Sequence, residues 1–245
     1  EIIFHESLVD TLNNTTEGWA AGLQLVAIAL QAELASQAAD PETILNRFVS
    51  ELSGSHRYIL DYLMEEVLSR ETPQIRAFLL STCLLERFTA DLCAAVLSDD
   101  SVPAAQEILE YLERANLFVV PLDGTRQWFR YHQLFADMLH KQLMHDHPDL
   151  VPVLHHRAAL WYEGQAMLDE ALAHALQSGD PDFPAVMLEK HTLRAILQGR
   201  IASAQRWMNA LPVETLLSHP RLCLDRAWAL TFSSQTEAAI PFLER

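Results

Sequence analysis

One stretch near the middle of the chain predicts a β-hairpin followed directly by a helix, and it limits the folds open to the rest. Residues 116–122 and 127–132 are rich in the aromatic and β-branched side chains that suit half-buried strands. Asp123 and Gly124 lie between them and favour a tight hairpin turn, because glycine tolerates a positive φ. Apolar residues then recur at helical spacing over 133–143. The pattern predicts a two-stranded wing with a helix attached.

Outside this stretch the sequence predicts helices. Glycine is scarce, at 7 of 245 residues, and 50% of the residues are hydrophobic, which is enough for substantial cores. Thr72 followed by Pro73 marks one helix start and Thr89 marks the next, because each threonine places a capping hydroxyl ahead of an apolar periodic run. A third helix is predicted over 103–115. Three helices, a hairpin and a closing helix are the element order of a winged helix module.

Beyond residue 148 the helices are predicted to form hairpin pairs. An Arg-Ala sequence with a nearby Trp occurs at 157–161 and again at 226–228, an offset of about twice the roughly 34-residue period of tetratricopeptide repeats. This recurrence favours a tetratricopeptide-like (TPR-like) α-solenoid. The predicted pairs are 153–163 with 168–177, 183–198 with 201–211, and 220–232 with 236–243.

Charge and cysteine content exclude several classes of function. The formal net charge is −16, which opposes binding to nucleic acid or to an anionic membrane, since both need a cationic surface. No apolar run reaches the roughly 18 residues of a membrane span. The three cysteines have no regular spacing, so we expect buried free thiols and a cytoplasmic location. The eleven histidines lack metal-ligand spacing, so we expect no metal site.

Several segments together resemble the large MalT-like regulators, the LuxR-type transcriptional activators of the STAND class of signal-transducing ATPases. The resemblance covers nearly the whole chain and includes Tyr-His-Gln-Leu-Phe-Ala-Asp at 131–137. It implies a mainly α fold made of a helical lid, a winged helix module with a β-hairpin, and a TPR-like α-solenoid. The segments that carry the resemblance are 16–25, 48–63, 112–118, 131–137 and 169–172.

The domain order implied by the resemblance has three parts here. Residues 1–71 correspond to the end of the nucleotide-binding region and the helical lid, 72–147 to the winged helix module, and 148–245 to truncated TPR-like repeats. The first residue is Glu, and we interpret the chain as part of a longer protein. No phosphate-binding loop ending in Gly-Lys-Ser/Thr occurs, so we expect no enzyme activity and no cofactor in this chain. ATP or ADP is expected in the full-length protein.

The resemblance also nominates nucleotide-contacting residues. Gly18, Trp19 and Ala20 match a Gly-x-Pro turn that lines the adenine site in such ATPases, with Ala in place of the usual Pro. Trp19 is as consistent with a place in the core as with a contact to adenine. His132 matches a winged-helix histidine that often reaches the β-phosphate of bound ADP, and the start of the following helix also attracts anions. The alternative is a histidine that only caps this helix.

Three functions are open at this point. The first is a signal-coupling segment of an ATP-dependent transcriptional activator, linking nucleotide state to an inducer-sensing repeat domain. Its partners would be the protein's own nucleotide-binding and DNA-binding domains, and a small-molecule inducer or a protein on the solenoid. The second is a protein-interaction scaffold with a purely structural winged helix. The third, DNA binding by the winged helix, is opposed by Glu107, Glu110 and Glu113 on the helix 103–115.

Overall fold

A computed structural model describes residues 68, 71–98, 102–114 and 118–243 of the 245-residue chain. It divides into two compact units, residues 1–148 and 149–245, each of which is described here by itself. The predicted helical lid, 1–71, lies almost entirely outside the described residues. No helix in the described ranges is both long and apolar enough to cross a bilayer.

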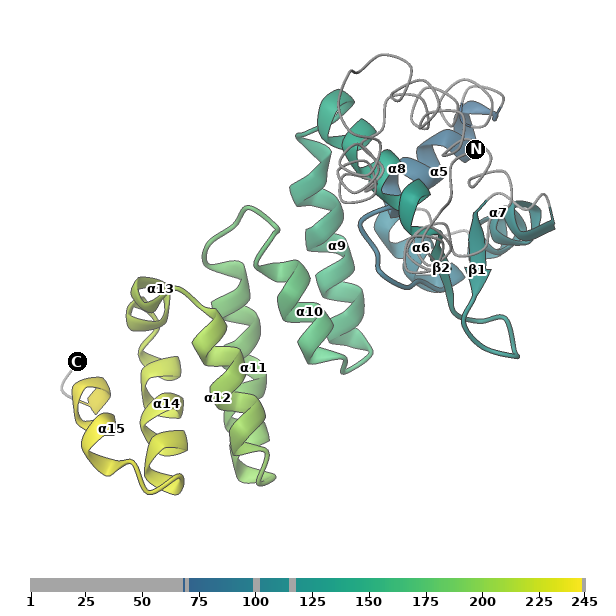
Figure 1. Ribbon diagram of the computed structural model, residues 1–245. Coiled ribbons are helices and arrows are strands. Elements are labelled where there is room, and N and C mark those ends of the chain that lie inside the picture. Colours follow the sequence, from purple (N-terminus) through teal and green to yellow (C-terminus); the bar gives the residue numbers. More distant parts are fainter. Residues whose placement is uncertain (1–67, 69–70, 99–101, 115–117, 244–245) are drawn as a thin grey trace, which may run out of the picture. The chain divides into compact units, whose positions relative to one another are not determined.

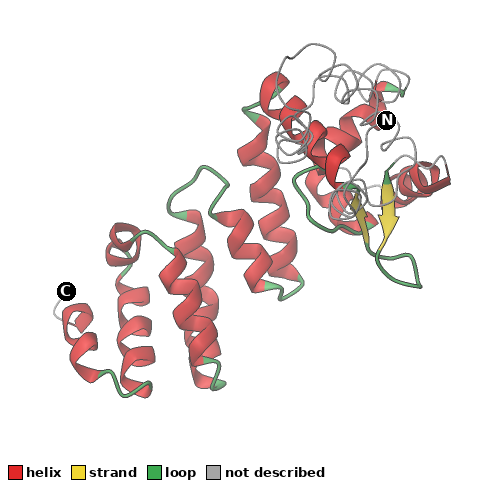
Figure 2. Ribbon diagram, viewed as in Figure 1, coloured by secondary structure: helices red, strands yellow, loops and turns green. Residues whose placement is uncertain are grey.

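The first unit has the element order of a winged helix module. Helix α8 packs on α5, α6 packs on both α5 and α7, and strand β1 contacts α7. Figure 2 shows the two strands in yellow among these helices. The elements, labelled in Figure 1, are α5 (Pro73–Thr82), α6 (Ala90–Leu97), α7 (Val102–Arg114), β1 (Val119–Pro121), β2 (Phe129–Tyr131) and α8 (Gln133–Asp146).

The two predicted helix starts in this unit are confirmed by their capping geometry. Thr72 has an extended backbone, and its Oγ1 accepts a hydrogen bond from the backbone N–H of Ile75 at 3.3 Å. Thr89 does the same for Leu92 at 3.2 Å. Each hydroxyl satisfies one of the N–H groups that a helix start leaves unpaired. Pro73 occupies the first turn of α5, where no N–H is needed.

The hairpin has a third pairing partner that the sequence did not reveal. Strands β1 and β2 are antiparallel, with Val120 opposite Arg130. Phe88, in the segment between α5 and α6, also pairs with Phe129: each backbone N–H donates to the other's carbonyl, at 2.8 and 2.9 Å. Phe88 therefore anchors the wing to the helices through the outer edge of β2.

The hairpin loop differs from the predicted tight turn at Gly124. Gly124 does not have a positive φ; Arg126 does, at 53°. The Asp123 carboxylate accepts hydrogen bonds from the backbone N–H of Gln127 and of Trp128, both at 3.0 Å. An aspartate side chain thus closes a five-residue loop, 123–127, and this removes the need for a two-residue turn with glycine at positive φ. The same hydrogen bonds lower the pKa of Asp123.

The second unit consists of stacked antiparallel helix pairs: α9 with α10, α11 with α12, and α14 with α15. The first helices of these pairs start 33 and 37 residues apart, near the roughly 34-residue tetratricopeptide period. Membership of that repeat class remains a prediction. The helices are α9 (Leu150–Gly164), α10 (Leu168–Ala175), α11 (Phe183–Leu197), α12 (Ile201–Ala210), α13 (Val213–Ser218), α14 (Pro220–Phe232) and α15 (Thr236–Leu243); α13 was not predicted.

Small side chains let the helices of the second unit approach closely. Ala158, Ala159, Ala171 and Ala175 on α9 and α10 are all 0% exposed. Trp207 on α12 is buried in the largest core cluster of the unit. Tryptophans are highly buried on average, but Trp228 is 49% exposed, whereas Leu222 and Leu230 on the same helix are buried.

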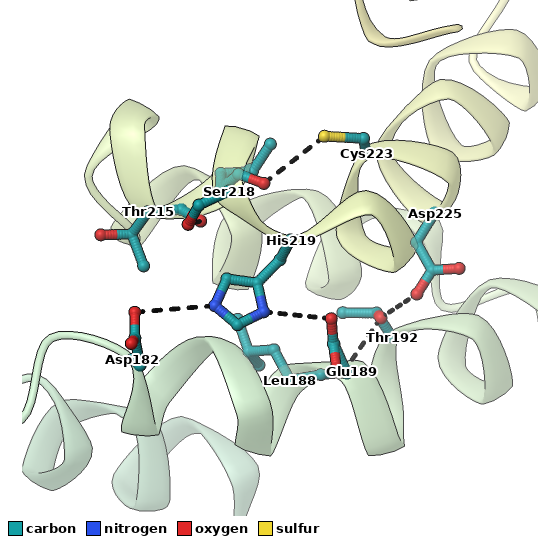
Figure 3. A network of polar contacts seen from close by, with 10 residues as sticks. Asp182, Leu188, Glu189, Thr192, Thr215, Ser218, His219, Cys223 and Asp225 are labelled. Atoms are coloured by element: carbon teal, nitrogen blue, oxygen red, sulfur yellow. Dashed lines mark hydrogen bonds and ion pairs between the residues drawn. The ribbon is translucent and has the colours of Figure 1, made fainter. Parts of the chain in front are cut away.

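A polar network joins α11 to α13 and α14 (Figure 3). His219 Nδ1 lies 3.1 Å from a carboxylate oxygen of Glu189, and its Nε2 lies 3.8 Å from Asp182. The buried Thr192 hydroxyl donates to the buried Asp225 carboxylate, whose pKa is raised by burial. Polar groups buried between helices fix their register, since each pair is costly to break.

Candidate functional site

His132 connects strand β2 to helix α8. Its backbone N–H donates to the carbonyl of Phe118 at 2.7 Å, and its carbonyl accepts from Ala136 N at 2.9 Å. The imidazole is 5% exposed and makes no hydrogen bond that caps α8. The side chains around the ring, and not a capping hydrogen bond, therefore hold the imidazole at the N-terminus of α8.

Those surroundings are an aromatic cluster formed by Phe88, Phe118, Tyr131 and Phe135. The Phe118 ring lies edge-on to His132 at 6.4 Å and stacks on Phe135 at 4.7 Å between ring centres. Tyr131 meets Phe135 at 6.0 Å and Phe88 at 4.6 Å. Such offset and edge-on contacts are the favourable geometries for aromatic rings. The cluster contacts the imidazole through the ring of Phe118.

Phe118 reaches this position through an unusual backbone conformation. Its φ is 61°, in the left-handed region that bulky residues rarely adopt. In this conformation Phe118 stacks on Phe135, and its carbonyl accepts the hydrogen bond from His132 N–H. Strain of this kind is retained where the surrounding contacts over-determine it, and it often accompanies a functional site.

The cluster is tied to α5 by a pair of buried hydroxyl groups. The Thr82 hydroxyl donates to the Phe78 carbonyl at 2.7 Å, so the Tyr131 hydroxyl donates to Thr82 Oγ1, also at 2.7 Å. A threonine hydroxyl has one proton to give and can still accept, which makes both contacts compatible. Burial raises the pKa of Tyr131, so the phenol stays protonated and able to donate.

Replacement of Tyr131 by Phe is expected to lower the free energy of unfolding of the first unit by about 1 kcal/mol, because one buried hydrogen bond is lost while Thr82 keeps its backbone partner. Urea titration and amide exchange of the unit give the value. Tyr111→Phe is the matched control: Tyr111 is 41% exposed and donates to Glu71 at the surface, so its loss should cost less than about 0.5 kcal/mol. Equal costs would show that the Thr82 contact adds nothing.

A polar hollow of about 400 Å³ lies at the start of α8 and is lined in part by Cys83, Glu86, Arg130 and Gln133. Arg130 brings a cation to the hollow, and its Nη1 donates to the Tyr131 carbonyl at 3.2 Å. Burial raises the pKa of the Cys83 thiol to about 12, so this cysteine is not an activated nucleophile. Arg130 and Glu86 bring charges of opposite sign to this hollow, so it is the backbone N–H groups at the start of α8 that favour an anion there.

Of the four predicted site residues, His132 alone lies in the described part of the chain. Gly18, Trp19 and Ala20 lie outside the described residues, so their relation to His132 stays a prediction. Sequence reasoning did not identify the aromatic neighbours of His132 or the Thr82–Tyr131 contact, because these residues come together only in three dimensions. In the described part of the chain, no three His, Cys, Asp or Glu side chains are grouped so that they could hold a metal ion.

Comparison with known families supports the architecture. A family model described as the MalT winged helix domain matches residues 64–151, which include every element of the winged helix described above. The chain is MalT-like. Its mainly helical fold with one two-stranded antiparallel hairpin agrees with the fold class implied by the sequence resemblance.

The MalT-like chain matches curated relatives over about nine tenths of its own length. It is 30% identical to the HTH-type transcriptional regulator MalT of Vibrio parahaemolyticus over 223 residues, which are 91% of this chain and 24% of the relative. It is 31% identical to MalT of Yersinia pestis, over 89% and 23%. It is 33% identical to the serine/threonine-protein kinase PknK of Mycobacterium tuberculosis, over 90% and 19%. The chain thus spans about a quarter or less of each relative.

Helix α7 of the MalT-like winged helix is acidic on its solvent side. Glu107 and Glu110 are exposed, and Glu113 forms an ion pair with Arg126 of the hairpin loop at 3.5 Å. Phosphate contacts supply most of the affinity of DNA-binding modules, and they need lysine and arginine at such positions. The charge on α7 opposes a direct contact with DNA.

Proposed function

We propose that this chain is the segment of a MalT-like transcriptional regulator that couples the nucleotide state of an ATP-binding domain to an inducer-sensing helical repeat domain. Its partners are the nucleotide-binding and DNA-binding domains of the full-length protein, and its place is the cytoplasm. The coupling works by differential packing: a ligand that binds one arrangement of the domains better shifts the population toward it.

The kinds of relatives support a regulatory role for this segment. A transcriptional regulator and a protein kinase have different outputs, yet both contain a stretch similar to nearly the whole of this chain. A segment shared by proteins with different outputs is better suited to controlling an output than to producing one. The same reasoning supports a non-enzymatic role for this segment.

The observation that carries the proposal is the placement of His132. The ring is buried, is held against Phe118, and leaves the start of α8 without a side-chain cap. A helix start without a side-chain cap favours an anionic partner, and the neighbouring hollow contains the cation of Arg130 alongside the carboxylate of Glu86. We propose that the imidazole and this helix end receive the β-phosphate of ADP in the full-length protein and so hold the resting arrangement.

The test is ADP binding by a longer version of the protein that carries an upstream phosphate-binding loop. We expect His132→Gln to weaken ADP binding by about tenfold or more, because a charge-assisted hydrogen bond contributes about 1.5–3 kcal/mol. His140→Gln is the matched control, since His140 lies on α8, the helix that follows His132, and is exposed. Undiminished ADP affinity in the His132 variant, with its amide exchange unchanged, removes the β-phosphate role.

A scaffold role is the second candidate, favoured by one feature of the second unit. Trp228, Phe232 and Leu243 are 49, 55 and 58% exposed and line an apolar hollow of about 280 Å³. Exposed aromatic and aliphatic side chains around a hollow are typical of protein-binding surfaces. Under this alternative, Trp228→Ala abolishes the protein's regulatory output, whereas His132→Gln leaves it unchanged; under the coupling function the effects are reversed.

A further inference from the structure

Two histidines meet inside the first helix pair of the second unit. His155 on α9 and His174 on α10 have their Nδ1 atoms 2.8 Å apart, with ring centres 5.0 Å apart. His155 is 4% exposed, and the His174 ring is stacked on Tyr162 with 5.4 Å between centres. This contact joins the two helices across the face on which the small residues Ala158 and Ala171 pack.

A contact between two Nδ1 atoms depends on the number of protons present. One neutral imidazole donates its N–H and the other accepts, which satisfies both atoms with a single proton at the contact. When both rings are protonated, each Nδ1 carries a hydrogen, and two positive charges face each other across 2.8 Å. Burial, together with the charge of His155, lowers the pKa of His174 to about 4.

Charged groups on the surrounding helices do not offset the lowering of the His174 pKa. Besides Tyr162, the other charged or titratable groups on α9 and α10 are His156, Arg157, Glu163, Asp169 and Glu170, and those on α11 are Glu189, Lys190, His191 and Arg194. Glu163 pairs with Lys190 at 3.2 Å and with His191 at 2.9 Å, and Asp169 pairs with Arg206 at 2.7 Å. Within the described chain, the charge that acts on His174 is that of His155.

These ion pairs join α9 and α10 to different neighbouring helices. Glu163 ties α9 to α11, while Asp169 ties α10 to α12 through Arg206 and through Trp207 Nε1, which donates to it at 2.6 Å. Asp169 keeps its partners when the pH falls toward 5, since its pKa is lowered from the ordinary value. The histidine contact is therefore an acid-sensitive link within a helix pair that also packs through buried alanines, while separate ion pairs join each helix to a different neighbour.

We propose that the α9–α10 helix pair is a proton-operated latch, closed by the neutral His155–His174 contact and released when this histidine pair takes up protons. The latch gives the helical repeat unit a response to acidification that is local to its first pair. It is independent of the nucleotide coupling proposed above, because it involves neither His132 nor the winged helix.

The direction of the pH dependence follows from the difference in proton uptake. In the open pair His174 is solvated and titrates near 6.5, whereas in the closed pair its pKa is about 4. Between these values the open state binds more protons, so the closed state loses stability as the pH falls from 6.5 toward 4. Above about pH 7 the stabilisation is complete.

The experiment is amide hydrogen exchange of the 245-residue chain at pH 7 and pH 5, corrected for the intrinsic exchange rates. We expect the opening equilibrium of α9 and α10 amides to rise about tenfold or more at pH 5, while amides of α12 and α14 change less than about twofold. In His174→Asn, whose amide replaces Nδ1 but does not titrate, this rise should disappear. His140→Asn, an exposed histidine of the first unit, should behave as the wild type.

A second measurement uses the wild-type protein, so it tests the latch even when the His174 variant folds poorly. The carbon chemical shifts of the two imidazoles in the wild-type protein report their titration directly, and we expect at least one of the pair to titrate well below 6. Two outcomes overturn the latch: an opening equilibrium of α9 and α10 that is the same at pH 7 and pH 5, or a wild-type pair in which both histidines titrate near 6.5.

Discussion

Replacing Trp207 by Ala is expected to lower the free energy of unfolding of the second unit by about 3–5 kcal/mol. The side chain is 1% exposed and belongs to the cluster that includes Leu172, Leu188 and Leu222, so the substitution opens a cavity between three helix pairs. It also removes the hydrogen bond from the indole N–H to Asp169 at 2.6 Å. Both losses act on the packing of α12.

The measurement is urea unfolding of the chain followed by amide exchange of α11, α12 and α14. Trp228→Ala is the matched control, because it removes the same side chain from a position that is 49% exposed. We expect the control to cost less than about 1 kcal/mol. Similar costs for the two tryptophans would mean that burial in this cluster does not set the stability of the unit.

Replacing Phe135 by Ala is expected to lower the free energy of unfolding of the first unit by about 3–5 kcal/mol. Phe135 is 0% exposed and contacts both Phe118 and Tyr131, so its loss removes the shared support of the aromatic cluster. Phe118 keeps its strained φ of 61° only while such contacts favour it. We therefore also expect the backbone at 118 to relax.

Amide exchange and nuclear magnetic resonance shifts of β1, β2 and α8 test both expectations. Phe232→Ala is the control, since Phe232 lies in the second unit and is 55% exposed. This variant should leave the stability of the first unit unchanged. A Phe135 variant with wild-type exchange in β2 would contradict the role given to the cluster.

The fold could be predicted wherever the signals are local. Thr72 and Thr89 begin helices because a hydroxyl three residues before an N–H can cap it, and that spacing is visible in the chain. The apolar periodicity of 133–143 predicted the buried side of α8. The hairpin was found for the same reason, since aromatic and β-branched residues on both sides of Asp123 and Gly124 are neighbours in sequence.

The failures also have a common cause. The pairing of Phe88 with Phe129 crosses about forty residues, so no local pattern announces it. The hairpin loop is closed by the Asp123 carboxylate, which accepts from two backbone N–H groups, and this choice among several possible turns depends on the final geometry of both strands. Trp228 is exposed because helix packing, not residue type, decides which side of α14 is covered.

The candidate site divides in the same way. The sequence by itself determined the helical character, the hairpin, the order of the winged helix elements and the position of His132 at a strand-to-helix junction, since these depend on residues close together in the chain. Only the tertiary structure decided that His132 lies against Phe118 and that His155 meets His174. Contacts between distant residues arise from packing, where shape and burial select one partner among many that the sequence alone leaves equivalent.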